Sequence, residues 1–222
     1  MTISAAQVKE LREKTGLGLM DCKKALEEAN GNIDLAIEEL RKTSGVKASK
    51  KSGRSAADGL IGIMDNGPDR FMTEVNCETD FVARDESFVQ FTEETLKTYA
   101  NNSEKNLEQL LEEGIEANRE KLVQKLGENI VVRRVARTVD SAVTGSYLHS
   151  NKKIGCLVSL EGGSESLAND IAMHAAATDP MAVSPDDIPK DIVDKEREIF
   201  KAQSEDSGKP PEIVEKMIEG KV

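Results

Sequence analysis

The chain has 222 residues, 38% of them hydrophobic, so it is long enough to bury a core and to form one to three compact units. It carries 30 Lys and Arg against 41 Asp and Glu, a net charge of −11, which argues against nucleic-acid binding over its whole surface. No apolar run approaches the roughly 20 residues that span a bilayer, and we expect no signal or transit peptide at the N-terminus. The expected partners are therefore proteins, with no direct contact to nucleic acid or membrane.

The cysteines and histidines show no pattern of catalysis or metal binding. Cys22, Cys77 and Cys156 are odd in number and widely spaced, and they form no C-x-x-C motif. This argues against a disulfide framework and a zinc site, and it suits a reducing compartment such as the cytoplasm. His149 and His174 accompany no nucleophile pattern. We therefore expect no catalytic use of these histidines, and no metal or cofactor.

Residues 1–41 are expected to form a bundle of three short helices. Apolar residues recur at helical spacing in three stretches, which are separated by "GLG" at 16–18 and "NGN" at 30–32. Asn32 is a plausible N-cap of the third helix. Helices this short need tertiary packing to be stable, so the three should share one core.

The next stretch, residues 42–57, loses all apolar periodicity. Its sequence "KTSGVKASKKSGRSAA" is basic and contains no acidic residue. Two interpretations are open: a flexible, solvated linker, or a basic arm that steers the chain toward an acidic partner.

A first α+β unit is expected over residues 58–140. "GLIGIM" and "RFMTEVN" flank "DNGPD", a hairpin signal with Asn66-Gly67 as the turn dipeptide. A helix with Phe88 and Phe91 on its apolar face follows, and "ENIVVRRVAR" near the end of the unit has strand character. Between hairpin and helix, "CETDFVARDE" places Phe81 among charged residues, where a lone aromatic needs an explanation.

The same order of elements recurs in residues 141–180, which we interpret as a second, incomplete copy of the unit. "GSYLHSNKKIGCLVSLEGGSESLANDIAMHAAA" again predicts strand, turn, strand, loop and helix. Where the first copy has "CETDFVA" the second has "GGSESLA", so the scaffold is repeated and the aromatic residue is not.

Residues 181–222 are expected to form an antiparallel pair of helices joined at "SGKPP". The second copy does not receive a strand equivalent to residues 129–137. We therefore expect that the chain is truncated and that one edge of the second sheet lacks a partner.

Four motifs in this order resemble those of bacterial translation elongation factor Ts. They are "VKELREKTGLGLMDCKKALEEANGNIDLAIEELRK", "EVNCETDFVARDESF", "GENIVVRRVAR" and "SGKPPEIVEKMIEG". The resemblance implies an α+β fold: an N-terminal bundle like a ubiquitin-associated module, a linker, a duplicated core of antiparallel sheet with helices, and a coiled-coil helical hairpin at the C-terminus.

The resemblance also implies a function. Members of this family act as guanine nucleotide exchange factors that bind elongation factor Tu with GDP, displace Mg²⁺ and promote GDP release. The residues implied in Mg²⁺ displacement are Thr79, Asp80, Phe81 and Val82. Those implied in partner binding are Arg12, Leu19, Met20, Lys23 and His149. A homodimer and a heterotetramer with the partner are both compatible with the family.

Without the resemblance, several of these residues have a simpler interpretation. Phe81 is equally open to folding back on its own helix and to contacting a partner, Leu19 and Met20 would belong to a core, and Arg12 and Lys23 would be solvated charges. Two other functions are also open: an adaptor that binds a ubiquitin-like or other helix-binding protein through residues 1–41, and an RNA-binding protein that uses the basic stretch together with "VVRRVAR".

Overall fold

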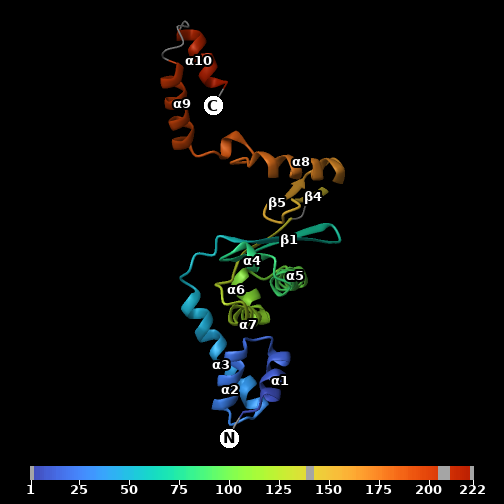
Figure 1. Cartoon of the computed structure of the whole chain (residues 1–222). Coiled ribbons are helices and arrows are strands. Elements are labelled where there is room, and N and C mark those ends of the chain that lie inside the picture. Colours follow the sequence, from blue (N-terminus) through green and yellow to red (C-terminus); the bar gives the residue numbers. More distant parts are fainter. Residues whose placement is uncertain (1–2, 139–142, 205–210, 221–222) are drawn as a thin grey trace. The chain divides into compact units, whose positions relative to one another are not determined.

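A computed structural model of the chain describes residues 3–138, 143–204 and 211–220 and shows a mixed α+β protein (Figure 1). The chain divides into two compact units, Met1–Ala177 and Thr178–Val222. The first unit contains every described strand and the helices that pack on the strands.

The first unit begins with three helices, α1 (Ala5–Thr15), α2 (Leu19–Glu28) and α3 (Ile33–Lys51). Their buried apolar residues form one cluster around Leu11 and Leu26, both fully buried. Gly16, with φ of 69°, ends α1 in the left-handed conformation, and the Asn32 side chain accepts a hydrogen bond from the Leu35 N–H at 3.1 Å. The predicted N-cap of α3 is therefore confirmed.

The predicted linker at 42–57 is wrong for residues 42–51, because these residues are the second half of α3. Helix α3 packs on α7 (Glu116–Leu126), and Ser44 and Ala48 are the residues that it buries in this half. Small side chains let two helices approach closely but contribute little to an apolar pattern. Two of the basic side chains contact other parts of the first unit: Lys47 forms an ion pair with Asp21 at 2.8 Å, and the ammonium of Lys51 donates to the carbonyl of Gly127.

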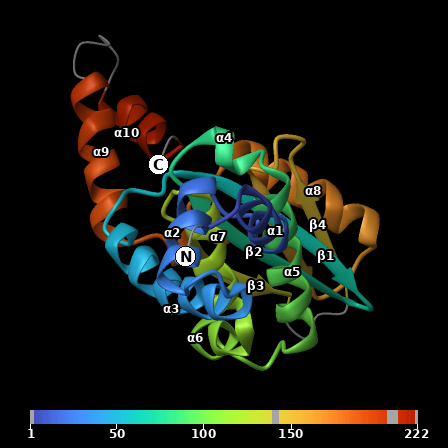
Figure 2. The same cartoon turned by 60° about the horizontal axis from the view of Figure 1, so that its bottom comes forward.

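A three-stranded antiparallel sheet forms the centre of the first unit. Its strands β1 (Asp58–Asn66), β2 (Asp69–Cys77) and β3 (Val131–Arg137) pair in the order β1-β2-β3. Helix α5 (Glu86–Asn101) packs on β1 and β2 (Figure 2) and contributes Phe88 to a core that contains Phe71. The predicted turn dipeptide is corrected by one residue: Asn66 pairs with Asp69, so Gly67-Pro68 forms the turn.

Short helical segments lie on both sides of α5 in the sequence. Helix α4 (Asp80–Ala83) precedes α5, and α6 (Leu107–Leu110) follows it. A π-helical segment, Leu111–Ile115, leads into α7 and includes Gly114 with φ of 93°, which marks a kink between two helices. Helix α7 thus lies between the N-terminal helices and the core of the sheet, because it contacts both α3 and α5.

A second hairpin, β4 (Val143–Leu148) and β5 (Gly155–Leu160), leads into α8 (Glu165–Thr178). Helix α8 lies very close to β4, since a Cβ atom added to Gly145 would be 2.5 Å from the backbone of Ala168. A Cβ atom on Gly155 would be 2.9 Å from Ile61, which shows that the second hairpin packs on the first. Within the described residues, this second sheet has two strands.

The second unit contains a 3₁₀ turn, Pro185–Asp187, and helices α9 (Lys190–Ser204) and α10 (Pro211–Glu219), which contact each other. Of the expected turn "SGKPP", residues 207–210 lie outside the described residues, and Pro211 begins α10. Every helix in the part of the chain that the structure describes is too short or too polar to cross a membrane.

The corrected boundary of α3 gives a testable prediction. Ala48→Glu would place a carboxylate at a position that is 1% exposed, so we expect it to lower the free energy of unfolding by about 3 kcal/mol. Ser49→Glu, which adds the same charge at the exposed neighbouring position, is the control and should change it little. Urea unfolding measures both variants, and equal effects would contradict the packing of α3 on α7.

Candidate functional site

The strongest candidate for a contact with another molecule is the loop formed by residues 78–83, which includes the short helix α4 and contains all four predicted exchange residues. Thr79 is the N-cap of α4, and its hydroxyl accepts a hydrogen bond from the Val82 N–H at 3.4 Å. The helix itself has only four residues, Asp80–Ala83. A helix this short has no stability of its own, so the surrounding contacts determine its position.

Helix α4 buries one side and exposes the other. Val82 is 9% exposed and Ala83 is 3% exposed, and both belong to the core beneath the sheet. Phe81, between Asp80 and Val82, is 83% exposed. The simpler interpretation, in which this ring folds back on its own helix, is therefore wrong for the free chain. The structure also separates Val82 from the other three residues, because Val82 anchors the loop from inside.

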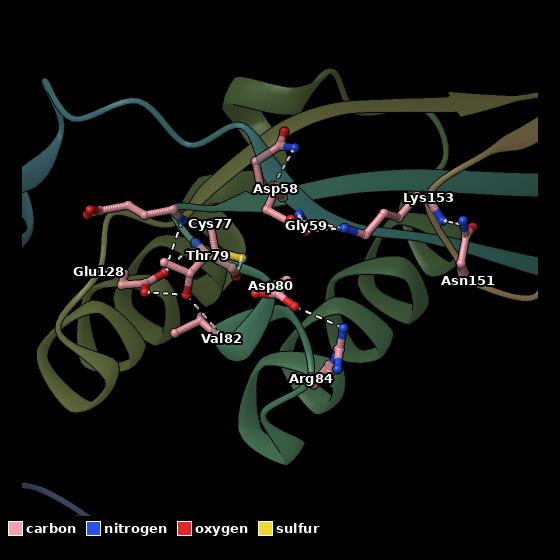
Figure 3. A network of polar contacts seen from close by, with 12 residues as sticks. Asp58, Gly59, Cys77, Thr79, Asp80, Val82, Arg84, Glu128, Asn151 and Lys153 are labelled. Atoms are coloured by element: carbon pink, nitrogen blue, oxygen red, sulfur yellow. Dashed lines mark hydrogen bonds and ion pairs between the residues drawn. The ribbon is translucent and has the colours of Figure 1, made fainter.

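Polar residues of this segment and of the turn at Glu128 form a network of hydrogen bonds (Figure 3). The Glu128 carboxylate accepts from the backbone N–H groups of Glu78 and Thr79, each at 3.0 Å, and from the Thr79 hydroxyl at 2.6 Å. Asp80 forms an exposed ion pair with Arg84 at 2.9 Å. Exposed pairs of this kind are weak, so the Asp80 carboxylate is available for another cation.

The predicted residues of the N-terminal helices lie on the surface. Leu19 is 54% exposed and Met20 is 71% exposed at the start of α2, so the interpretation of these two as core residues is wrong. Arg12 is exposed on α1. Lys23 is exposed on α2, where it is 3.8 Å from the carboxylate of Glu27. The start of α2 therefore presents two neighbouring apolar side chains to solvent.

His149 begins the turn between β4 and β5. Its backbone N–H donates to the carbonyl of Ile154 at 2.9 Å, and its ring lies edge-on to Tyr147 with centroids 6.3 Å apart. The side chain is half-buried, and its Nδ1 has no hydrogen-bond partner among the residues that the structure describes. The predicted residues thus come from three regions of the first unit: α1 and α2, the loop into α4, and the β4–β5 turn.

The arginines of β3 are less available for RNA than their sequence indicates. Arg133 and Arg134 both form ion pairs with Glu74 on β2, and Arg137 pairs with Glu104. Arg133 and Arg134 share one carboxylate and remain exposed, so these pairs offset only part of the positive charge of the strand. Among the described residues, no group of three or more His, Cys, Asp or Glu is placed to hold a metal ion.

Sequence reasoning missed Cys77 and Glu128, which support the loop from below. The Cys77 thiol is buried and donates to the carbonyl of Thr79 at 3.2 Å. Burial, together with the nearby charges of Glu128 and Asp58, raises the pKa of this thiol to about 12. Glu128 lies 49 residues from Thr79 in the sequence, and no local pattern predicts such a contact.

The raised pKa predicts that Cys77 is inert while the loop is in place. At pH 8 its thiolate fraction is roughly a thousandfold below that of an ordinary thiol, and the thiolate is the reactive form. Iodoacetamide should therefore alkylate Cys77 at least that much more slowly in the folded chain than in urea, as measured by peptide mass spectrometry. Rates within tenfold of each other would show that the loop opens readily.

A family model and individual proteins of known family both match this chain, and they agree on the family. The family model described as "Elongation factor TS" matches residues 78–222. Elongation factor Ts from Marinobacter nauticus is 54% identical to this chain over 222 residues, which is 99% of this chain and 76% of that protein. Elongation factor Ts from Hahella chejuensis is 52% identical, over 99% of this chain and 77% of its own length. Because both comparisons agree over most of the chain, the protein belongs to the elongation factor Ts family of translation elongation factors.

Proposed function

We propose that this chain is a guanine nucleotide exchange factor for elongation factor Tu. It binds elongation factor Tu with GDP, weakens the hold on Mg²⁺ and thereby promotes GDP release. It makes and breaks no covalent bond, so it is not an enzyme. The observation that carries the proposal is the exposure of Phe81, 83% in the free chain, on a loop that is otherwise hydrogen-bonded and packed.

A GTPase holds its nucleotide through backbone amides, a lysine and a Mg²⁺ ion that bridges protein and phosphates. Loosening one of these anchors weakens the others. The Phe81 ring can enter an apolar slot of the partner, and burying such a side chain contributes roughly 1.5–3 kcal/mol. Asp80, next to it, brings a carboxylate toward the ion. An aromatic anchor surrounded by polar residues has the properties of an interface hot spot.

The energy of one ring is too small for the whole effect. If the factor weakens GDP binding by a given ratio, GDP weakens binding of the factor by the same ratio. A thousandfold ratio requires about 4 kcal/mol of differential binding. We therefore propose that Leu19 and Met20, with Arg12 and Lys23 beside them, and His149 supply additional contacts. In this proposal the N-terminal helices act as a ubiquitin-associated-type module, and α9 and α10 belong to a coiled-coil hairpin.

The first test replaces the ring. Phe81→Ala should lower the rate of release of labelled GDP from elongation factor Tu about tenfold or more at saturating factor, because the anchor is removed. Phe81→Leu, which keeps an apolar side chain, should lie between wild type and Phe81→Ala. Val46→Ala, an exposed apolar position on α3, is the control. Unchanged release with Phe81→Ala would contradict the proposal.

The second test separates binding from exchange. Leu19→Ala should weaken binding to elongation factor Tu about fivefold, with little change in the maximal rate of GDP release, because α2, which carries Leu19, packs in the cluster of the N-terminal helices and not in the core that holds α4. Leu35→Ala is a matched control: it removes the same side chain from the same group of helices at similar exposure, 51% against 54%. Titration of the factor at fixed elongation factor Tu gives both quantities. A loss of maximal rate with full affinity would show that Leu19 acts in exchange itself.

A further inference from the structure

The Glu128 carboxylate holds the base of the exposed loop. Its Oε2 accepts from the N–H groups of Glu78 and Thr79, and its Oε1 accepts from the Thr79 hydroxyl. The same hydroxyl accepts from the Val82 N–H and so caps α4. The half-buried Glu128 side chain therefore accepts hydrogen bonds from both backbone N–H groups that precede the helix, and it orients Thr79, the N-cap. Bonds of this kind, to an ionised acceptor, are among the strongest hydrogen bonds in proteins.

The turn that carries Glu128 is itself held in place. Gly127, with φ of 80°, ends α7, and its carbonyl accepts from the ammonium of Lys51 at the end of α3. The Asn129 backbone N–H donates to the Glu78 carboxylate at 2.6 Å, and its side-chain amide donates to the Arg54 carbonyl at 2.8 Å. The turn at 127–129 thus connects the segment that follows the N-terminal helices to the loop that carries the exposed ring.

We propose that Glu128 is a positioning residue for exchange: it fixes the direction in which Phe81 leaves the surface. This inference rests on the proposed function. Glu128 need not contact the partner, because it acts through Thr79 and the start of α4. The reason for fixing the ring is entropic. A loop that is already ordered loses less conformational freedom on binding than a mobile one, so more of the energy of burying the ring appears as binding.

A carboxylate suits this position better than its neutral counterpart. It accepts from three donors at once, whereas a glutamine offers one acceptor oxygen and two N–H groups. Glu128→Gln nevertheless retains part of the network, because its amide oxygen can accept from the backbone and its NH₂ can donate to the Thr79 hydroxyl. Glu128→Ala retains none of it. The two variants therefore form a graded pair at one position.

The first measurement is hydrogen exchange of the backbone amides in the free, full-length chain. Glu128→Ala should accelerate exchange of the Glu78 and Thr79 amides at least tenfold. The amides of Leu11 and Leu26, in the core of α1 and α2, should exchange at unchanged rates. Glu128→Gln should give an intermediate acceleration. Glu93→Gln, which removes an exposed carboxylate from α5, is the charge control and should match wild type. Unchanged exchange at 78 and 79 in Glu128→Ala would overturn the inference.

The second measurement is release of labelled GDP from elongation factor Tu. Glu128→Ala should lower the maximal rate about tenfold, and Glu128→Gln should restore most of it. Melting temperatures of the variants are compared, because a merely structural role would lower stability without this partial rescue. Faster amide exchange with a wild-type rate of GDP release would overturn the inference but not the proposed function. If elongation factor Tu also releases GDP at the wild-type rate with Phe81→Ala, the proposed function fails, and the inference about exchange fails with it.

Discussion

The exposure of Phe81 depends on how helix α4, which has only four residues, is held in one orientation. Helix α4 cannot be stable in isolation, because forming a first helical turn fixes several residues for a single hydrogen bond. Val82 and Ala83 secure it by burying their side chains in the core, and Thr79 caps its N-terminus. With one side fixed inside and the cap fixed at the start, Phe81 has only the outer side available. The exposed ring is thus a consequence of packing and not of a loose loop.

Much of the fold follows from the sequence because apolar periodicity and turn residues act locally. The three N-terminal helices, the first hairpin and the strand-turn-strand-helix order after residue 141 are all present where the sequence predicts them. The second half of α3 was missed because its contact face consists of small residues, Ser44 and Ala48, which leave no apolar pattern. The hairpin turn was misplaced by one residue because Asn66-Gly67 and Gly67-Pro68 are both good turn sequences, and strand register decided between them.

The candidate site was predictable only in its exposed part. The sequence singles out Phe81 because an aromatic residue among charges has no obvious core role. It gives no indication of Glu128, which meets Thr79 only after β3 has been placed beside β2. Nor does it separate Val82, an inward anchor, from its three neighbours in the motif. Contacts between residues far apart in sequence are set by the tertiary fold, and this chain's local patterns do not encode them.

The regions proposed to touch a partner are connected by polar contacts within the first unit. Near the loop, Asp58 pairs with Lys153 of the β4–β5 turn at 2.9 Å, and this hydrogen bond lowers the pKa of the Asp58 carboxyl. Arg70, only 7% exposed, contacts both Asp65 on β1 at 3.0 Å and Glu165 on α8 at 2.6 Å.

These contacts bear on the proposed exchange mechanism through linkage. A free-energy difference of several kcal/mol has to be distributed over several contacts. Each contact contributes fully only if its residues are already ordered, because ordering them on binding would cost conformational entropy. The Asp58–Lys153 pair links the β4–β5 turn, which begins at His149, to β1. On the other side of the loop, the turn at 127–129 holds the segment after α3. A partner that meets Phe81 therefore meets a surface whose neighbouring parts are already ordered.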